Sequence, residues 1–77
     1  MTLQRERVKS SVIESLGYDT ERHTLEVEFR TGRIYQYFMV PPDLHRRLMN
    51  AKSIGGFFNR RLRDVYRCDE VTKGRIG

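Results

Sequence analysis

The chain has 77 residues, of which 38% are hydrophobic and 32% charged, and it carries a net charge of +5. This length and composition suit one folded domain rather than a disordered chain. The single cysteine excludes an internal disulfide, no apolar run reaches the ~20 residues of a membrane-spanning helix, and the charged N-terminus is unlike a signal peptide. We therefore expect a single domain over residues 1–77, in the cytoplasm, with no membrane partner.

The first half of the chain predicts three antiparallel strands. Residues 12–18 form a strand whose alternation changes parity near Ser15 and Leu16, which indicates a β-bulge. Residues 25–29 alternate between hydrophobic and charged side chains, the pattern of a half-buried strand. Residues 34–40 are rich in β-branched and aromatic side chains and predict the third strand.

The turn between the second and third strands determines which face the tyrosines occupy. A three-residue loop over residues 30–32 puts Gly32 at a positive φ, in a type I turn with a G1 bulge. A two-residue loop would force Thr31 to a positive φ, which a β-branched residue disfavours. We therefore expect the three-residue loop, which pairs Val27 with Tyr35 and buries Tyr35 on the face of the other apolar side chains.

Two helices are predicted in the second half. Pro41 and Pro42 end the sheet, because proline cannot donate to a strand ladder but suits a first helical turn. The first helix then runs to about residue 51. Ser53 is the expected N-cap of a second helix, which extends to about residue 67.

These elements predict an α+β fold in which a three-stranded antiparallel sheet is followed by two helices packed on one face. The folded core spans about residues 8–67, and the tail over residues 69–77 is expected to fray. The opposite sheet face, which carries Glu26, is expected to be open, so that exposed Ile34 and Phe38 would support a homodimer. The predicted core consists of Phe29, Tyr35, Tyr37, Leu44, Leu48, Phe58 and Leu62.

A set of residues spread over positions 8–66 resembles a known family. The set comprises Ser11-x-Ile13, Gly17-Tyr18-Asp19, Leu25-x-Val27-x-Phe29, Gly32, Tyr35-x-Tyr37, Val40-Pro41, Leu48, Ala51-x-Ser53, Gly55, Phe58-Asn59 and Tyr66. The family it resembles is the KTSC domain, named after a C-terminal extension of some lysyl-tRNA synthetases and also found as stand-alone bacterial proteins. The resemblance implies an RNA-binding role, by association with the synthetases.

The side chains that usually carry catalysis or bind metals are few. Neither His23 nor His45 has a cysteine, histidine or carboxylate at ligand spacing. Cys68 is followed by two acidic residues, which would raise the pKa of a thiol rather than activate it. We therefore expect no catalytic residue, no metal site and no cofactor, and a binding module rather than an enzyme.

Tyr35 and Tyr37 admit two interpretations. Aromatic side chains on a central strand can stack on the bases of single-stranded RNA. However, a domain of this size needs large side chains in its core. We favour core tyrosines with their hydroxyls at the rim.

The charge is unevenly distributed along the chain. Residues 1–40 contain six Lys or Arg and six Asp or Glu, whereas residues 41–77 contain nine and four, so the whole excess lies in the second half. Such asymmetry favours a polyanionic partner, with a merely solvated face as the alternative.

The arginines of the second predicted helix are the candidate binding residues. They fall on one helical face. A helix laced with salt bridges would show acids at matching positions, and only Asp64, four residues after Arg60 and in the weaker orientation, does so; we therefore predict that these arginines lack acidic partners. Arginine also suits bidentate contact with phosphate. We predict a nucleic-acid partner, RNA in the first place, with an acidic protein as the alternative. The predicted binding residues are Arg60, Arg63, Arg67, Arg46 and Lys52.

Overall fold

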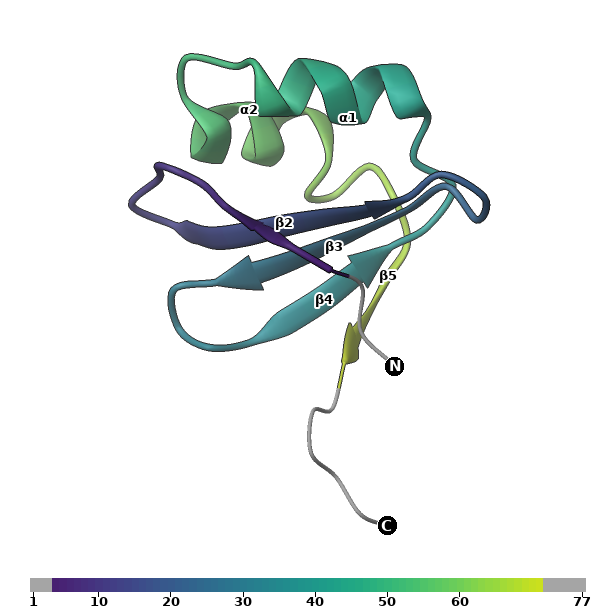
Figure 1. Cartoon of the computed structure of the whole chain (residues 1–77), viewed down its shortest axis with the longest axis horizontal. Helices are drawn as coiled ribbons and strands as arrows, with labels where there is room; N and C mark the ends of the chain where they lie inside the picture. The colour runs from purple at the N-terminus through teal and green to yellow at the C-terminus, as the bar shows by residue number, and fades with distance from the viewer. Residues whose placement is uncertain (1–3, 72–77) are drawn as a thin grey trace, which may run out of the picture.

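The computed structural model describes residues 4–71, in which two helices lie over one face of a five-stranded antiparallel sheet (Figure 1). The strands follow one another across the sheet in chain order, β1-β2-β3-β4-β5. No helix in this part of the chain is long and apolar enough to cross a membrane. The elements are β1 (Glu6–Arg7), β2 (Ile13–Asp19), β3 (Thr24–Phe29), β4 (Ile34–Tyr37), α1 (Pro42–Met49), α2 (Ile54–Arg61) and β5 (Cys68–Val71).

The sheet has five strands, so the expectation of three was wrong. The short β1 pairs with β2, and β5 pairs with β4 with Cys68 opposite Tyr37. Both edge strands are mostly exposed and lack an apolar stripe, so they have no period-2 signal. They form because the neighbouring strand would otherwise leave the backbone N–H and C=O groups of its edge unpaired. Residues 69–71 of the expected frayed tail are therefore paired, and its remainder lies outside the described residues.

The predicted hairpin and register are confirmed. Gly32 has a φ of 98°, and the Phe29 amide donates to the Arg33 carbonyl at 2.9 Å, which closes the three-residue loop. Val27 lies opposite Tyr35 in the ladder. A register shift between Ile13 and Ser15 marks the bulge, just before the position predicted for it.

The core lies between the sheet and the helices, and five of the seven residues predicted for it are buried there. The Phe58 ring contacts Phe29 and Tyr37 edge to face, with ring centroids 5.6 and 5.2 Å apart. Phe29 and Tyr35 are only half-buried and pack against the margin of the core. The buried apolar side chains are Ile13, Leu16, Leu25, Val27, Tyr37, Val40, Leu44, Leu48, Ile54, Phe58 and Leu62.

The second helix is shorter than expected. It begins at Ile54, where the Ser53 hydroxyl accepts from the Gly56 amide at 3.1 Å as the predicted N-cap. It ends at Arg61, and the next residue, Leu62, is completely buried. The chain turns there because it must return to the sheet to pair β5 with β4, which a helix continued to residue 67 would prevent.

The sheet face opposite the helices, here called the outer face, is not open as predicted. Glu26 and Ile34 are 0% and 2% exposed, and Phe38 is half-buried. The Arg5 side chain forms an ion pair with Glu26, which also accepts a hydrogen bond from Gln36 at 2.8 Å. Ile34 therefore offers no surface to a second copy, and a homodimer stays a prediction that sedimentation would test.

Candidate nucleic-acid interface

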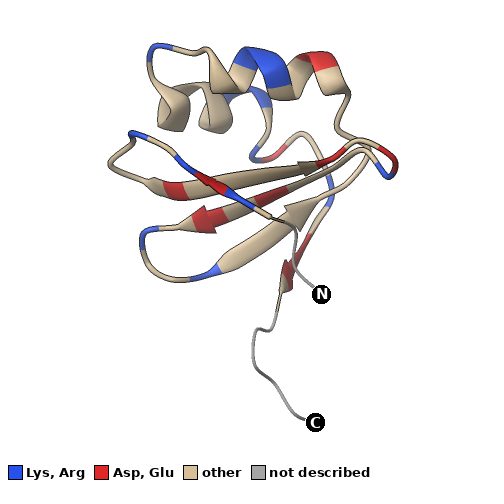
Figure 2. Ribbon diagram, viewed as in Figure 1, with Lys and Arg blue, Asp and Glu red and all other residues tan. Residues whose placement is uncertain are grey.

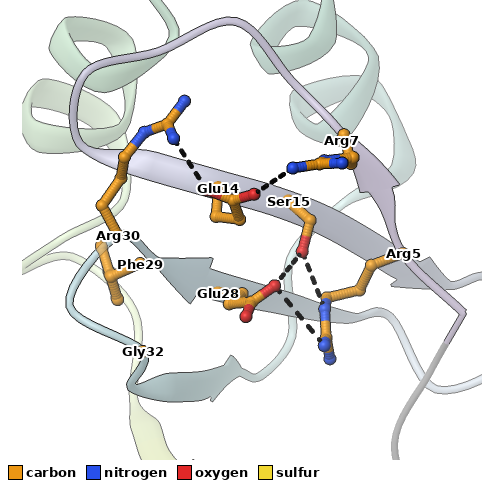
Figure 3. A pocket seen from close by; sticks show the side chains of 8 residues that line it. All are labelled: Arg5, Arg7, Glu14, Ser15, Glu28, Phe29, Arg30 and Gly32. Carbon is orange, nitrogen blue, oxygen red and sulfur yellow. Dashed lines mark hydrogen bonds and ion pairs between the residues drawn. The ribbon is translucent and has the colours of Figure 1, made fainter.

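A polar cavity of about 540 Å³ lies on the outer face (Figure 3). Glu14 accepts from both Arg7 and Arg30, at 2.9 and 2.8 Å, and the Ser15 hydroxyl donates to Glu28 at 2.8 Å. The cavity thus gathers several titratable side chains, as the cleft of an enzyme would. Both carboxylates are engaged, however, so neither is a free base and the arginines here are neutralised.

Arg60 lies in the last turn of α2, but Arg63 and Arg67 lie beyond the end of the helix. The prediction that these three residues form a stripe along one face of a helix is therefore wrong. Arg63 donates to the Asn59 side chain at 3.2 Å. Arg67 directly precedes β5, and its carbonyl accepts from the Phe38 amide at 2.9 Å. The residues still come from one short segment, which ends at the edge strand.

Arg60, Arg61, Arg63 and Arg67, here called the α2-side arginines, share one property. Across residues 4–71, no carboxylate lies within ion-pair distance of any of them. In Figure 2, α2 carries basic residues without an acidic one, whereas acidic residues mark the strands. The prediction that these arginines lack acidic partners is thus correct for the described residues.

The other two predicted binding residues differ from each other. Arg46 forms an ion pair with Asp43, which Arg47 also contacts at 3.0 Å, so its charge is partly neutralised. Lys52 is exposed in the connection between α1 and α2, without a carboxylate partner among residues 4–71. Lys52 therefore resembles the α2-side arginines, whereas Arg46 does not.

One cavity beside the arginines lies between α1 and the end of α2. Its volume is about 340 Å³, and it is lined by three arginines (Arg47, Arg60 and Arg61), one acid (Asp43) and apolar residues that include Pro41 and Val65. The Arg61 guanidinium also sits 5.6 Å from the Phe57 ring centroid, a cation–π contact that orients it. This cavity thus presents positive charge beside apolar surface.

A second cavity, here called the sheet groove, lies on the helix side of the sheet, between the β3–β4 hairpin and the turn after α2. Its volume is about 620 Å³. Tyr35 was predicted to be buried in the core, yet it is only half-buried and lines this groove. The groove was missed because chain order does not show that the hairpin and residues 59–64 meet. A usable signal existed, since Ser11, Phe29, Tyr35, Tyr37 and Asn59 of the family pattern all line it.

The two tyrosines that line this groove differ in how deeply they are buried. Tyr37 is 4% exposed and hydrogen-bonded to the Cys68 thiol; burial first, and then this thiol, raises the pKa of its phenol. Its hydroxyl therefore stays protonated at physiological pH. Tyr35, in contrast, keeps part of its ring accessible.

The histidines do not join these cavities to the cysteine. His45 stacks on the Tyr18 ring at 4.5 Å, and burial lowers its pKa below 6.5, opposed in part by nearby Glu6. The groove that Cys68 lines contains no histidine. Among residues 4–71, no three side chains of histidine, cysteine, aspartate or glutamate come together as a metal site would require.

Comparison with known proteins places this fold in a family context. The model of the KTSC domain matches residues 9–66. An uncharacterized protein of Stutzerimonas stutzeri is 46% identical over 57 residues, which cover 74% of this chain and 80% of that protein. A solved KTSC domain protein from Yersinia pestis has 38% sequence identity and a TM-score of 0.89, and the match covers 92% of this chain and 100% of that one.

Synthetase relatives match over a smaller share of their own length. A lysine–tRNA ligase of Nostoc punctiforme is 34% identical over 64 residues, which are 83% of this chain but 11% of the ligase. A ligase of Trichormus variabilis is 30% identical over the same length and share. The chain therefore corresponds to about a tenth of these enzymes, and their activity does not transfer with the match.

Proposed function

The chain belongs to the KTSC domain family, and from that premise we propose that it is a non-enzymatic module that binds nucleic acid, RNA in the first place, through the α2-side arginines. The observation that carries the proposal is their lack of carboxylate partners among residues 4–71. Unpaired arginines are free to contact phosphate oxygens, often in bidentate fashion.

Two further observations support this function. The net positive charge of the sequence lies entirely in its second half, and α2 contains no acidic residue. Several relatives are named as lysine–tRNA ligases, so the domain occurs in proteins that carry tRNA in their name. The cytoplasm is the compartment we propose, since a single exposed thiol at Cys68 suits a reducing environment.

The test is fluorescence anisotropy with a labelled single-stranded RNA and a tRNA mixture. Affinity should fall steeply between about 50 and 200 mM salt, because phosphate contacts release condensed counterions. Replacing Arg60, Arg63 and Arg67 with glutamine should weaken binding to all sequences alike, since phosphate contacts do not read sequence.

A matched control removes the same charge elsewhere. Arg7, Arg22 and Arg33 are exposed and distant in sequence from α2. Their triple glutamine variant has the same net charge as the α2-side variant, so it reports the effect of total charge at exposed positions, two of which pair with Glu14 and Glu70. Equal RNA affinity of the two variants would overturn the assignment of the binding surface.

The alternative function is binding of a protein with an acidic surface. The observation that favours it is the cavity between α1 and α2, where Arg60 and Arg61 lie beside Val65, whose side chain is 63% exposed. Charge beside an exposed apolar residue is typical of a protein-binding surface. Under this alternative, neither RNA binds at physiological salt, and an acidic protein is recovered with the domain in pull-downs.

A further inference from the structure

The sheet groove holds an aromatic ring in a defined position without enclosing it. Tyr35 contacts Phe29 edge to face, with centroids 5.8 Å apart and planes at 76°. Phe29 is in turn fixed against the core residue Phe58 at 5.6 Å. Tyr35 is thus held by the core on one side and lines the groove, half-buried. A ring that is held but accessible suits a flat partner, because stacking then requires little reordering.

The groove walls carry polar groups that are only partly used. Asn59 accepts from Arg63 through its oxygen, and within residues 4–71 its amide nitrogen donates to no other side chain or backbone group. Asp64 forms no ion pair among the described residues. An amide donor and a carboxylate acceptor match the mixed hydrogen-bonding edge of a nucleobase.

Charge and size narrow the choice of occupant. Arg63 lines the groove without a carboxylate partner, so its guanidinium is available to a negative group beside the flat part of a ligand. The volume, about 620 Å³, lies within the usual range of small-ligand pockets. A nucleotide combines a flat ring, a polar ring edge and a phosphate. It therefore suits the exposed ring of Tyr35, the polar walls of the groove and the unpaired Arg63.

We propose that the sheet groove binds one unstacked base of a single-stranded nucleic acid, with the base against Tyr35 and the adjoining phosphate on Arg63. This inference rests on the proposed function and adds the kind of nucleic acid that is bound. A duplex keeps its bases stacked and paired, so it cannot fill the groove without unpairing. The domain should therefore prefer single strands over the duplex of the same sequence.

The direct test places 2-aminopurine at one position of a short single-stranded RNA. Stacking on Tyr35 should quench its fluorescence when the wild-type protein binds, whereas a duplex should show no change on binding. Tyr35→Leu keeps an apolar side chain without the ring and should lower single-strand affinity by about 5- to 150-fold, the usual effect of one base–aromatic stack. Tyr35→Phe keeps the ring and serves as the matched control.

A second variant guards against the case that Tyr35→Leu does not fold. Asn59 is exposed, so Asn59→Ala should keep the thermal unfolding midpoint while single-strand affinity falls by a few-fold. Because Asp64 accepts from amino groups, oligo(C) should bind more tightly than oligo(U), and Asp64→Asn should narrow that difference.

The outcomes separate this inference from the function it rests on. If the variant with Arg60, Arg63 and Arg67 replaced loses RNA binding, while Tyr35→Leu binds single strands as the wild type does and 2-aminopurine is not quenched, the groove is overturned and the function stands. Absence of any nucleic-acid binding by the wild type would overturn both. Equal affinity for single strand and duplex would also contradict the groove.

Discussion

The outer face and the segment from Arg60 to Arg67 both present several arginines, and they differ in what those arginines contact. On the outer face, Arg5 contacts Glu26 and Glu28, and Arg7 and Arg30 share Glu14. The α2-side arginines have no carboxylate partner among residues 4–71. The outer-face arginines are therefore part of the fold, whereas the α2-side arginines are available to a ligand.

This difference shows that residue counts along a sequence are a poor guide to binding charge. The first forty residues have no net charge because their six Lys or Arg and six Asp or Glu balance, and the structure joins many of them in pairs across the strands. In the second half, Asp43 pairs with Arg46 and Arg47, Glu70 pairs with Arg33, and neither Asp64 nor Asp69 pairs with an α2-side arginine among residues 4–71. An excess of positive charge is available to a ligand only where the fold does not pair it with acidic side chains.

Arg5→Ala should have the largest effect on stability. The change removes a cation from Glu26, which is 0% exposed, and losing one partner of a buried pair commonly costs about 3–5 kcal/mol. Chemical denaturation measures the loss. Arg7→Ala is the control, since its side chain is 85% exposed and should cost within about 1 kcal/mol. Similar losses in the free energy of unfolding for both variants would contradict the distinction between buried and surface ion pairs on this face.

Gly17→Ala tests whether the segment with β1 lies on β2 as described. A Cβ at Gly17 would come within 2.6 Å of the Gln4 carbonyl oxygen, so the N-terminal segment would have to shift. Overpacking of this kind costs about 1–3 kcal/mol, and Arg5 would be displaced with it. Thermal unfolding of the variant measures the cost. An unchanged midpoint would mean that the N-terminal segment does not hold Arg5 over Glu26.

Ser53→Ala examines the support of the α2-side arginines. The Ser53 hydroxyl caps α2 by accepting from the Gly56 amide, and loss of such a cap costs about 1 kcal/mol. Ser53→Asp keeps the acceptor and should behave like the wild type in denaturant titrations. If Ser53→Asp lost as much free energy of unfolding as Ser53→Ala, the hydrogen bond to the Gly56 amide would not be the source of the stabilisation.

Replacing Arg60, Arg63 and Arg67 with glutamine should have the smallest effect on stability for each residue changed. These residues are exposed and make no ion pair among residues 4–71, so each change should alter the free energy of unfolding by within about 0.5 kcal/mol. Chemical denaturation of the triple variant is the measurement. A loss comparable to that of Arg5→Ala would mean that the arginines support the fold, and would remove the contrast between the two regions.

The sequence alone determined the features that depend on neighbours in the chain. The Gly32 turn follows from the steric restriction on Thr31, and it sets the pairing of Val27 with Tyr35. The Ser53 cap and the predicted core residues Leu48 and Phe58 follow from spacing in the same way. These features are local, because backbone sterics and side-chain periodicity act over a few residues.

Only the tertiary structure decided the features that join distant segments. β5 has no apolar pattern and forms because the edge of β4 is free to pair, and that pairing ends α2 at Arg61. Glu26 looks like a solvent-facing residue in sequence and is buried because Arg5, twenty-one positions earlier, pairs with it. The sheet groove likewise brings Tyr35 and Arg63 together across the fold. Contacts of this kind depend on the three-dimensional arrangement of strands, which side-chain periodicity along the chain does not encode.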